Sequence, residues 1–169
     1  MNKKQHQSTK VVHAGLGKSQ NGEPFIPGPV FASTFHLSGD TNGDTHQYAR
    51  HAHPTWDVLE KSIGELEMGK VLIFPSGMAA AAAVMTSILK KGDSLLLASD
   101  GYHTTRSYAE NFLLKFGVNV KTLPTSQIPE ADFSSVKLVF IETPSNPMLD
   151  VVDIKKLAKK FILMVDYWR

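Results

Sequence analysis

Apolar and polar positions follow a regular order after about residue 54, and each block of the pattern predicts a helix or a strand. Residues 55–67 place Leu59, Ile63 and Leu66 on one side of an amphipathic helix. Short apolar runs bounded by turn residues indicate strands, and Gly92 and Gly117 are typical of helix ends. The pattern predicts helices at 55–67, 77–91, 104–116 and 151–160, and strands at 71–74, 94–98, 118–123, 137–142 and 161–165.

The predicted strands lack a clear alternation of polar and apolar residues, and helices separate most of them. Strands of this kind are typical of a mostly parallel sheet with helices on both faces, so the sequence predicts an α/β fold. Ligands in such folds bind beyond the carboxyl ends of the strands. For the helix at 151–160, Asp150 is the expected N-cap and Asp153 lies in the first turn.

Residues 1–54 form a different segment, which is rich in Gly, Pro, Asn, Asp and His. Its prolines and glycines interrupt any regular element, yet it contains apolar residues such as Phe25, Phe31 and Phe35 that could be buried. A segment of this length with little structure of its own is either disordered or packed on another surface. We expect an arm at 1–54 that packs on a neighbouring subunit, followed by a second domain at 55–169.

Composition narrows the class of protein without identifying it. The 169 residues are 42% hydrophobic and 20% charged, and 18 Lys and Arg nearly balance 16 Asp and Glu. Nothing in this balance indicates binding to nucleic acid or to an anionic membrane. The sequence has no cysteine, no secretory signal and no apolar run long enough to span a membrane. A cytoplasmic protein is the expectation.

Polar residues follow the predicted strands at the sheet edge where a ligand would bind. Ser76 and Gly77 lie between the strand at 71–74 and a helix, where free N–H groups could hold a phosphate, or the turn is a simple connection. Tyr102 follows the strand at 94–98, and it either stacks on a flat ring or is a surface tyrosine. Glu142 and Asn146 follow a third strand in a proline-stiffened turn, which either fixes the direction of their side chains or is a plain structural turn. Asp166 ends the last predicted strand and needs either a protonated ring nitrogen or a helix N–H as partner.

Taken together, these motifs resemble the cystathionine γ-synthase-like family of fold-type I pyridoxal-phosphate (PLP) enzymes. The likeness extends from about Thr9 to Asp166. It rests on the segments Val11-Val12-His13-Ala14-Gly15, Tyr48-Ala49-Arg50 with Pro54-Thr55, Ser76-Gly77-Met78-Ala79-Ala80, and Glu142-Thr143-Pro144-Ser145-Asn146-Pro147. The resemblance implies part of a PLP-transferase large domain of the aspartate aminotransferase type.

The resemblance also implies roles for individual residues. Ser76, Gly77 and Met78 match the phosphate-binding turn, and Tyr102 matches a tyrosine that stacks on the pyridine ring and takes part in catalysis. Asn146 matches the asparagine near the ring hydroxyl, and Asp166 the aspartate that pairs with the ring nitrogen. The second catalytic tyrosine is Tyr48, which with Arg50 matches a pair that reaches into the neighbouring subunit's phosphate site. That pair implies a homo-oligomer, either a dimer or a tetramer.

For activity, the resemblance implies a PLP-dependent carbon–sulfur lyase of sulfur amino-acid metabolism, and cystathionine γ-lyase is the first expectation. The alternatives are a cystathionine γ-synthase or a methionine γ-lyase. His103 and Thr104 depart from the family, in which two glycines are common. The chain also ends at Tyr167-Trp168-Arg169, before the family's cofactor-binding lysine and C-terminal domain. This end suggests a frameshift, a premature stop or a truncated gene model. It also raises a second class of function: a catalytically inert fragment that binds PLP weakly or docks on a homologous subunit.

A metal site is the remaining chemical alternative. His46, His51 and His53 are closely spaced, but no acid or cysteine completes a tetrahedral set beside them. Solvated loop histidines are the preferred interpretation, and no metal is expected.

Overall fold

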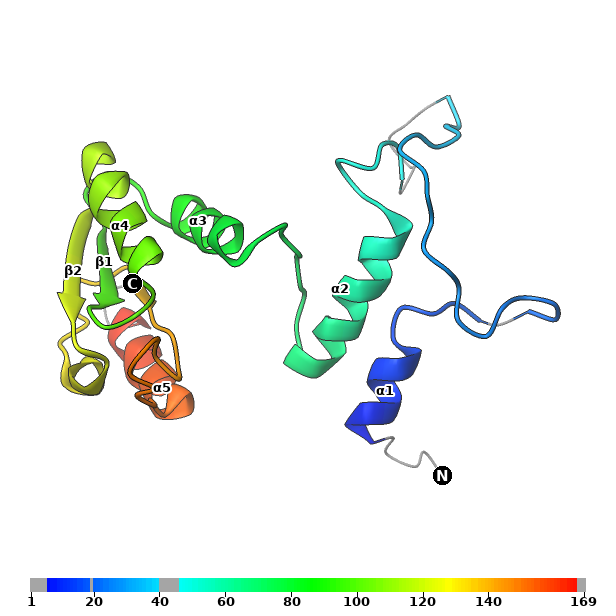
Figure 1. Cartoon of the computed structure of the whole chain (residues 1–169). Helices are drawn as coiled ribbons and strands as arrows, with labels where there is room; N and C mark the ends of the chain where they lie inside the picture. Colours follow the sequence, from blue (N-terminus) through cyan, green and yellow to red (C-terminus); the bar gives the residue numbers. More distant parts are fainter. Residues whose placement is uncertain (1–5, 19, 40–45, 167–169) are drawn as a thin grey trace. The chain divides into compact units, whose positions relative to one another are not determined.

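The computed structural model describes residues 6–18, 20–39 and 46–166, and its contacts divide the chain into two units, Met1–Ile73 and Phe74–Arg169. The first unit holds α1 (Gln7–His13) and α2 (Pro54–Glu67). The second holds the remaining elements (Figure 1): α3 (Gly77–Ile88), β1 (Ser94–Ala98), α4 (His103–Asn111), η2 (Leu113–Phe116), β2 (Asn119–Leu123), η3 (Thr125–Glu130), β3 (Leu138–Phe140) and α5 (Ile154–Asp166).

A three-stranded parallel sheet forms the centre of the second unit, in the order β2-β1-β3. The central strand β1 is buried along its whole length, and it pairs Leu96 with Lys121 of β2 and with Val139 of β3. Apolar side chains on both sides of β1 explain why this strand shows no alternation in the sequence. The predicted parallel sheet is confirmed.

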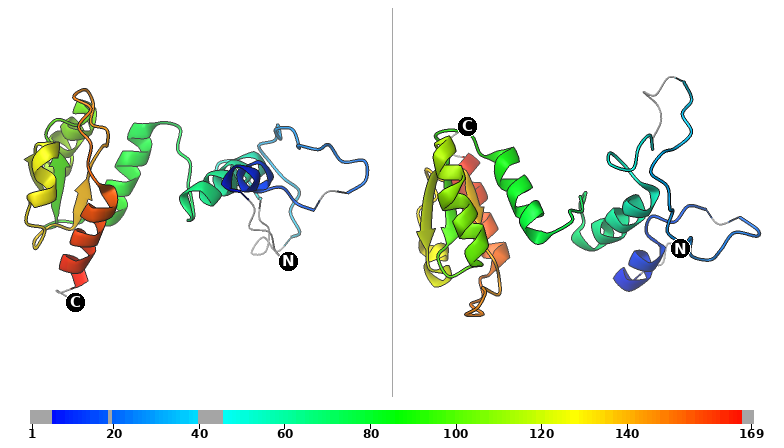
Figure 2. Two further views of the ribbon diagram at one scale, coloured as in Figure 1. Left: turned by 90° about the horizontal axis from the view of Figure 1, so that it is seen from below. Right: turned by 45° about the horizontal axis from the view of Figure 1, so that its top comes forward.

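Helices cover both faces of this sheet (Figure 2), and each face has its own apolar cluster. Leu96 and Ala98 face η3 and α5, whereas Leu95 and Leu97 face α3, α4 and η2. The buried members of the first cluster are Leu96, Ala98, Ile128, Phe133, Val136, Val152 and Leu157, and those of the second are Met85, Leu95, Leu97, Ala109, Leu113 and Val118. The predicted α/β class is therefore confirmed as well.

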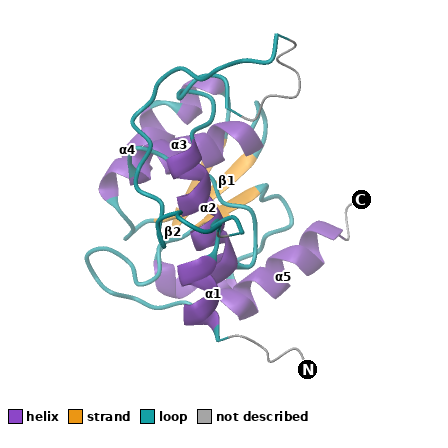
Figure 3. Cartoon of the chain, turned by 90° about the vertical axis from the view of Figure 1, so that its right-hand side faces the viewer, coloured by secondary structure: helices purple, strands orange, loops and turns teal. Residues whose placement is uncertain are grey.

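The first unit is built differently, because neither of its helices contains a buried residue. The helices contact each other, with Gln7 Nε2 donating to the Leu66 carbonyl at 3.2 Å. The described residues between them are mostly loop (Figure 3). The short helix α1 was not expected in a segment so rich in proline and glycine. Among the described residues of this unit, His53 is the one with a buried side chain.

The helix predicted at 55–67 is confirmed as α2. Pro54 occupies the first turn, where its missing N–H costs nothing, and His53 Nδ1 accepts a hydrogen bond from Thr55 N–H at 3.2 Å. The contacts group α2 with the arm, so the second unit begins at Phe74. The proposed division into an arm at 1–54 and a domain at 55–169 stays a prediction.

Two predicted strands are wrong. Residues 71–74 form no strand; Ile73 N–H donates to the Glu60 carboxylate at 2.9 Å instead, and Leu72 is 75% exposed. The run at 161–165 continues α5, in which Leu157 and Phe161, one turn apart, pack on the same apolar cluster. An apolar run forms a strand only beside a partner strand that binds its backbone N–H and C=O groups. Among the described residues, neither of these two runs has a partner strand.

Smaller differences concern the ends of the helices. The residue that caps α5 is Asp153, whose Oδ1 accepts from Lys156 N–H at 2.9 Å, rather than Asp150 as predicted. The helix predicted at 77–91 ends at Ile88. The one predicted at 104–116 is divided into α4 and η2, and Gly117, with a φ of 79°, ends it in a left-handed conformation.

Candidate functional site

A cavity of about 520 Å³ lies in the second unit at the carboxyl ends of β1 and β3. Its walls are the first turn of α3, the start of α4, and the residues in which the two strands end. Of the predicted site residues, the structure brings Ser76, Gly77, Met78, Tyr102 and Glu142 together around this cavity. The position agrees with the rule that ligands bind beyond the strand ends of a parallel sheet.

The first turn of α3 presents unpaired backbone donors to the cavity. Ser76 is the N-cap: its Oγ accepts from Ala79 N–H at 3.1 Å, and its carbonyl accepts from Ala80 N–H at 3.1 Å. Within the described part of the chain, the N–H groups of Gly77 and Met78 have no acceptor. Two free donors at the positive end of a helix form a site for an anion such as a phosphate group.

Glycine at position 77 keeps this turn open. A Cβ built on Gly77 would meet no atom within 4 Å, so packing does not require glycine here. The open space beside its N–H is what a phosphate group would need in order to approach closely. The turn therefore fits a phosphorylated ligand.

Tyr102 is held at both ends of its backbone at the edge of the cavity. Its N–H donates to Glu142 Oε2 at 3.0 Å, and its carbonyl accepts from Thr105 N–H at 3.1 Å. The residue is 42% exposed, and its ring meets the ring of His103 edge to face at a centroid distance of 5.1 Å. An aromatic ring exposed in this way at a cavity wall can stack on a flat ligand.

Side chains also fix the residues just before Tyr102. Asp100 Oδ1 accepts from both the N–H and the hydroxyl of Thr125, at 2.8 and 2.7 Å, and Arg106 donates to the Ser99 carbonyl. Desolvation raises the pKa of Asp100, but the hydrogen bonds from Thr125 outweigh it, and the pKa lies below its ordinary value. The loop that carries Tyr102 is thus anchored to η3 and to α4.

The structure does not bring Asn146 into this cavity. Asn146 is exposed, and its neighbour Ser145 is the buried residue of the turn. Ser145 N–H donates to the Asp150 carbonyl at 2.9 Å, and its Oγ accepts from Asp150 N–H at 3.0 Å. Asp166 is the last residue of α5 instead of a strand end, and its side chain lies outside the described residues. The roles of Asn146 and Asp166 stay predictions.

Tyr48 and Arg50 belong to the first unit, where they contact each other. Arg50 Nη2 donates to the Tyr48 hydroxyl at 3.2 Å, and the guanidinium carbon lies 5.1 Å from the centroid of the tyrosine ring. Tyr48 also forms an isolated antiparallel bridge with Thr34. Their predicted role in a neighbouring subunit stays a prediction.

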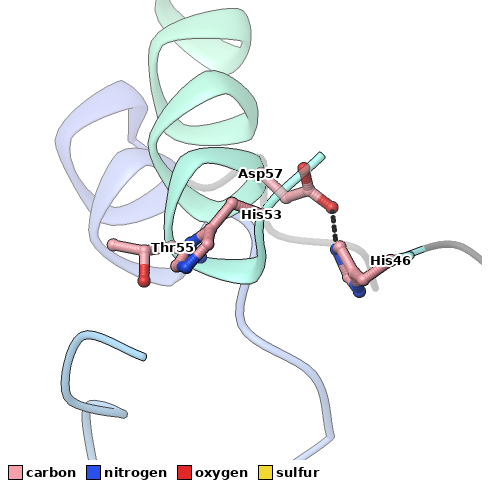
Figure 4. A network of polar contacts seen from close by, with 4 residues as sticks. All are labelled: His46, His53, Thr55 and Asp57. Carbon is pink, nitrogen blue, oxygen red and sulfur yellow. Dashed lines mark hydrogen bonds and ion pairs between the residues drawn. The ribbon is translucent and has the colours of Figure 1, made fainter. Parts of the chain in front are cut away.

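The three closely spaced histidines have separate contacts, and Figure 4 shows His46 and His53 with their partners Asp57 and Thr55. His46 Nε2 lies 2.9 Å from Asp57 Oδ2, His53 accepts from Thr55 N–H, and His51 contacts the ring of Tyr48. Across the ranges that the structure describes, no three or more His, Cys, Asp or Glu side chains are grouped as they would be around a metal ion. Over the same residues, no helix combines the length and apolar character required to cross a membrane.

Sequence reasoning missed the residues that hold the Tyr102 loop, which are Asp100, Thr125 and Arg106, and it missed the contact between Glu142 and Tyr102. These partners lie 7 to 40 positions apart in the chain. The positions of Asp100 after a strand and of Glu142 before two prolines marked both residues as candidates, but a position in the sequence does not predict which residue each one binds.

Known proteins are similar to this chain in sequence and in fold. The family model for "Cys/Met metabolism PLP-dependent enzyme" matches residues 8–166. A Streptomyces coelicolor protein whose name refers to cystathionine γ-lyase is 43% identical over 157 residues, which make up 89% of this chain and 40% of that protein. The cystathionine β-lyase of Lactococcus lactis is 33% identical over 155 residues, 89% of this chain and 40% of that protein.

Solved structures agree with these sequence matches. The crystal structure of metB from Corynebacterium glutamicum matches with a TM-score of 0.81 at 30% identity, over 92% of this chain and 42% of that one. The chain spans about two fifths of the length of the relatives named here. Because the family model covers nearly all of the 169 residues and the fold agrees, this chain belongs to the Cys/Met-metabolism family of PLP-dependent enzymes.

Proposed function

We propose that this chain forms part of the cofactor site of a PLP-dependent carbon–sulfur lyase of sulfur amino-acid metabolism, with cystathionine γ-lyase as the preferred activity. One observation carries the proposal: two unpaired N–H groups of a helix start and an exposed tyrosine ring line the same cavity. Relatives named as cystathionine lyases support the choice of reaction.

The residues that line the cavity provide the types of group that PLP requires, which are N–H donors for its phosphate and an aromatic ring for its pyridine. The N–H groups of Gly77 and Met78 would bind the phosphate, and the ring of Tyr102 would contact the flat face of the pyridine. When bound, PLP supplies an electron sink for the negative charge that develops at the substrate α-carbon. We propose that Asn146 and Asp166 complete the ring contacts, as the resemblance predicts.

The proposal extends to the arm and to assembly. Tyr48 and Arg50, which contact each other in the first unit, would reach the phosphate site of a second subunit in a homo-oligomer, as the resemblance predicts. A sulfur-containing amino acid would be the substrate, and the cytoplasm the proposed location.

The 169-residue chain by itself is proposed to be catalytically inert. No lysine is among the described residues that line the cavity, so no amine stands ready to bind the cofactor covalently. The purified chain with PLP should release no 2-oxobutyrate from cystathionine, and borohydride treatment should fix the cofactor to no single lysine. Turnover, or one lysine labelled in stoichiometric amount, would contradict this.

The cofactor site is tested by binding. PLP should bind the chain in equilibrium dialysis, and excess inorganic phosphate should displace it, because both ligands would use the donors of Gly77 and Met78. A family-length protein that contains this segment should convert cystathionine to 2-oxobutyrate with PLP and lose that activity without it. PLP binding that phosphate leaves unchanged would place the cofactor elsewhere.

A further inference from the structure

Glu142 lies where it can control the direction of the Tyr102 side chain. Tyr102 is the N-cap of α4, and its side chain makes no capping hydrogen bond of its own. Its carbonyl is fixed by the helix, through Thr105 N–H at 3.1 Å. Its N–H is fixed from outside the helix, by Glu142 Oε2 at 3.0 Å. With both peptide groups held, the Cα–Cβ bond of Tyr102 has one direction, which limits the ring to the few positions that its side-chain rotamers allow at the cavity wall.

The approach of Glu142 to this N–H depends on how the two strand ends are built. Glu142 follows β3 by two residues and is half-buried at the cavity wall. A Cβ at Gly101 would lie 3.4 Å from Ala98 and 3.9 Å from Glu142 Oε2, which are ordinary van der Waals distances, so the approach of the carboxylate does not depend on glycine at this position. A carboxylate that accepts a backbone N–H makes a stronger hydrogen bond than a neutral acceptor does.

Other contacts hold the loop, but none of them involves the Tyr102 N–H, which Glu142 binds. Asp100 is anchored to Thr125, and Ser99 is anchored to Arg106, so both contacts act before position 101. Among the described residues, the Tyr102 N–H has no acceptor other than Glu142. Removal of this one carboxylate should therefore release the tyrosine without unfolding the loop.

We propose that Glu142 is a positioning residue: its carboxylate holds the backbone of Tyr102 so that the ring faces the ring-binding side of the cavity. The inference rests on the proposed function, because it assumes that Tyr102 contacts a flat ligand there. It assigns Glu142 no contact with that ligand. The negative charge also serves no catalytic purpose in this role, so a neutral acceptor of the same length should replace it.

The test compares three variants of the 169-residue chain. Glu142→Met keeps the side-chain length and removes the acceptor, Glu142→Gln keeps a carbonyl acceptor without the charge, and Glu110→Ala removes an exposed carboxylate of α4. Fluorotyrosine labelling gives one fluorine NMR signal for each of the four tyrosines, and Tyr102→Phe assigns the signal of Tyr102. Affinities for PLP and for inorganic phosphate are measured on the same samples.

The proposal predicts a selective effect. Glu142→Met should shift or broaden the Tyr102 signal and speed exchange of the Tyr102 amide. It should also weaken PLP binding by up to about tenfold, because PLP binding must then supply the free energy that holds Tyr102, which is about that of one hydrogen bond. Phosphate affinity and the Tyr108 signal should stay as in the unmodified chain. Glu142→Gln should restore most of the PLP affinity, and Glu110→Ala should change nothing.

Three results would overturn the proposal. An unchanged Tyr102 signal in Glu142→Met would show that the carboxylate does not position the tyrosine. Equal loss of PLP affinity in the Gln and Met variants would indicate a direct contact between Glu142 and the ligand. Joint changes in all signals and in phosphate affinity would indicate a role in folding. If the unmodified chain binds neither PLP nor phosphate, the proposed function fails, and the tyrosine signals still decide the role of Glu142.

Discussion

At the scale of single residues, local contacts around the cavity could be predicted from the sequence, whereas contacts between distant residues could not. Ser76 was predicted to lie in an anion-binding turn, and it caps the helix whose next two N–H groups are unpaired. A cap and the donors beside it are neighbours in sequence, so local pattern is enough. The hydrogen bond from Tyr102 to Glu142 joins residues 40 positions apart, and no local pattern predicts it.

Gly77 offers a test in which stability and binding change in opposite directions. Gly77→Asp places a negative charge in the first turn of α3, where it should raise the free energy of unfolding by about 0.3–1 kcal/mol. The same charge should repel phosphate and lower the affinity for PLP by about tenfold or more. Urea unfolding and equilibrium dialysis measure the two effects. Gly77→Asn has nearly the same shape without the charge and is the control; equal PLP affinity in the two variants would contradict a phosphate site here.

The hydrogen bonds between Thr125 and Asp100 predict a pH dependence. The pKa of Asp100 is lowered in the folded protein, so ionised Asp100 adds stability above its unfolded pKa of about 3.9, and this stability is lost as the pH falls through the lower folded pKa. Asp100→Asn should therefore be less stable than the unmodified chain near neutral pH, and the difference should shrink below about pH 4. Urea unfolding at several pH values measures it; a difference independent of pH would contradict the assignment.

At the scale of elements, helices were easier to predict than strands. The apolar face of α2 repeats within the helix itself, so its spacing was enough. The runs at 71–74 and 161–165 are as apolar as β1, yet neither forms a strand. A strand needs a neighbour to accept its N–H groups, and that neighbour lies elsewhere in the chain. β1 has two neighbours, which is why its prediction was confirmed over all five residues.

The structure assigns the N-cap of α5 to Asp153 and not to the predicted Asp150. Asp153→Ala should lower the free energy of unfolding by about 0.5–2 kcal/mol, because Asp153 accepts the N–H of Lys156 at the helix start. Asp150→Ala is the matched control and should have a smaller effect, since alanine keeps the backbone bonds with Ser145 and removes a side chain that contacts Asp100 instead of the helix start. Urea unfolding measures both. The reverse order would show that the helix begins earlier.

At the scale of the whole chain, burial is distributed unevenly between the two units. The second unit has two apolar clusters around β1, whereas α1 and α2 contain no buried residue. Phe25 and Phe31 are 83% and 95% exposed. The sequence showed that the arm contains apolar residues, but not that its own unit leaves them uncovered, because burial depends on the partner surface.

This difference predicts a gradient of amide hydrogen exchange. Amides of β1 should exchange slowest, since they lie in the middle of the sheet under both clusters, and those of α1 and α2 should exchange faster by several orders of magnitude. Mass spectrometry of the 169-residue chain after timed labelling measures the gradient. Equal protection of α2 and β1 would show that the first unit has a stable core of its own.

The order β2-β1-β3 has a consequence for how the sheet assembles in time. The central strand is the first of the three along the chain, so both edges are recruited to a strand that is already synthesised. Pairing Leu95 with Val120 closes a shorter loop than pairing it with Leu138, and the shorter loop loses less chain entropy. Folding should therefore start with β1, β2 and the helical crossover between them, and the β3 edge, which brings Glu142 to Tyr102, should join last.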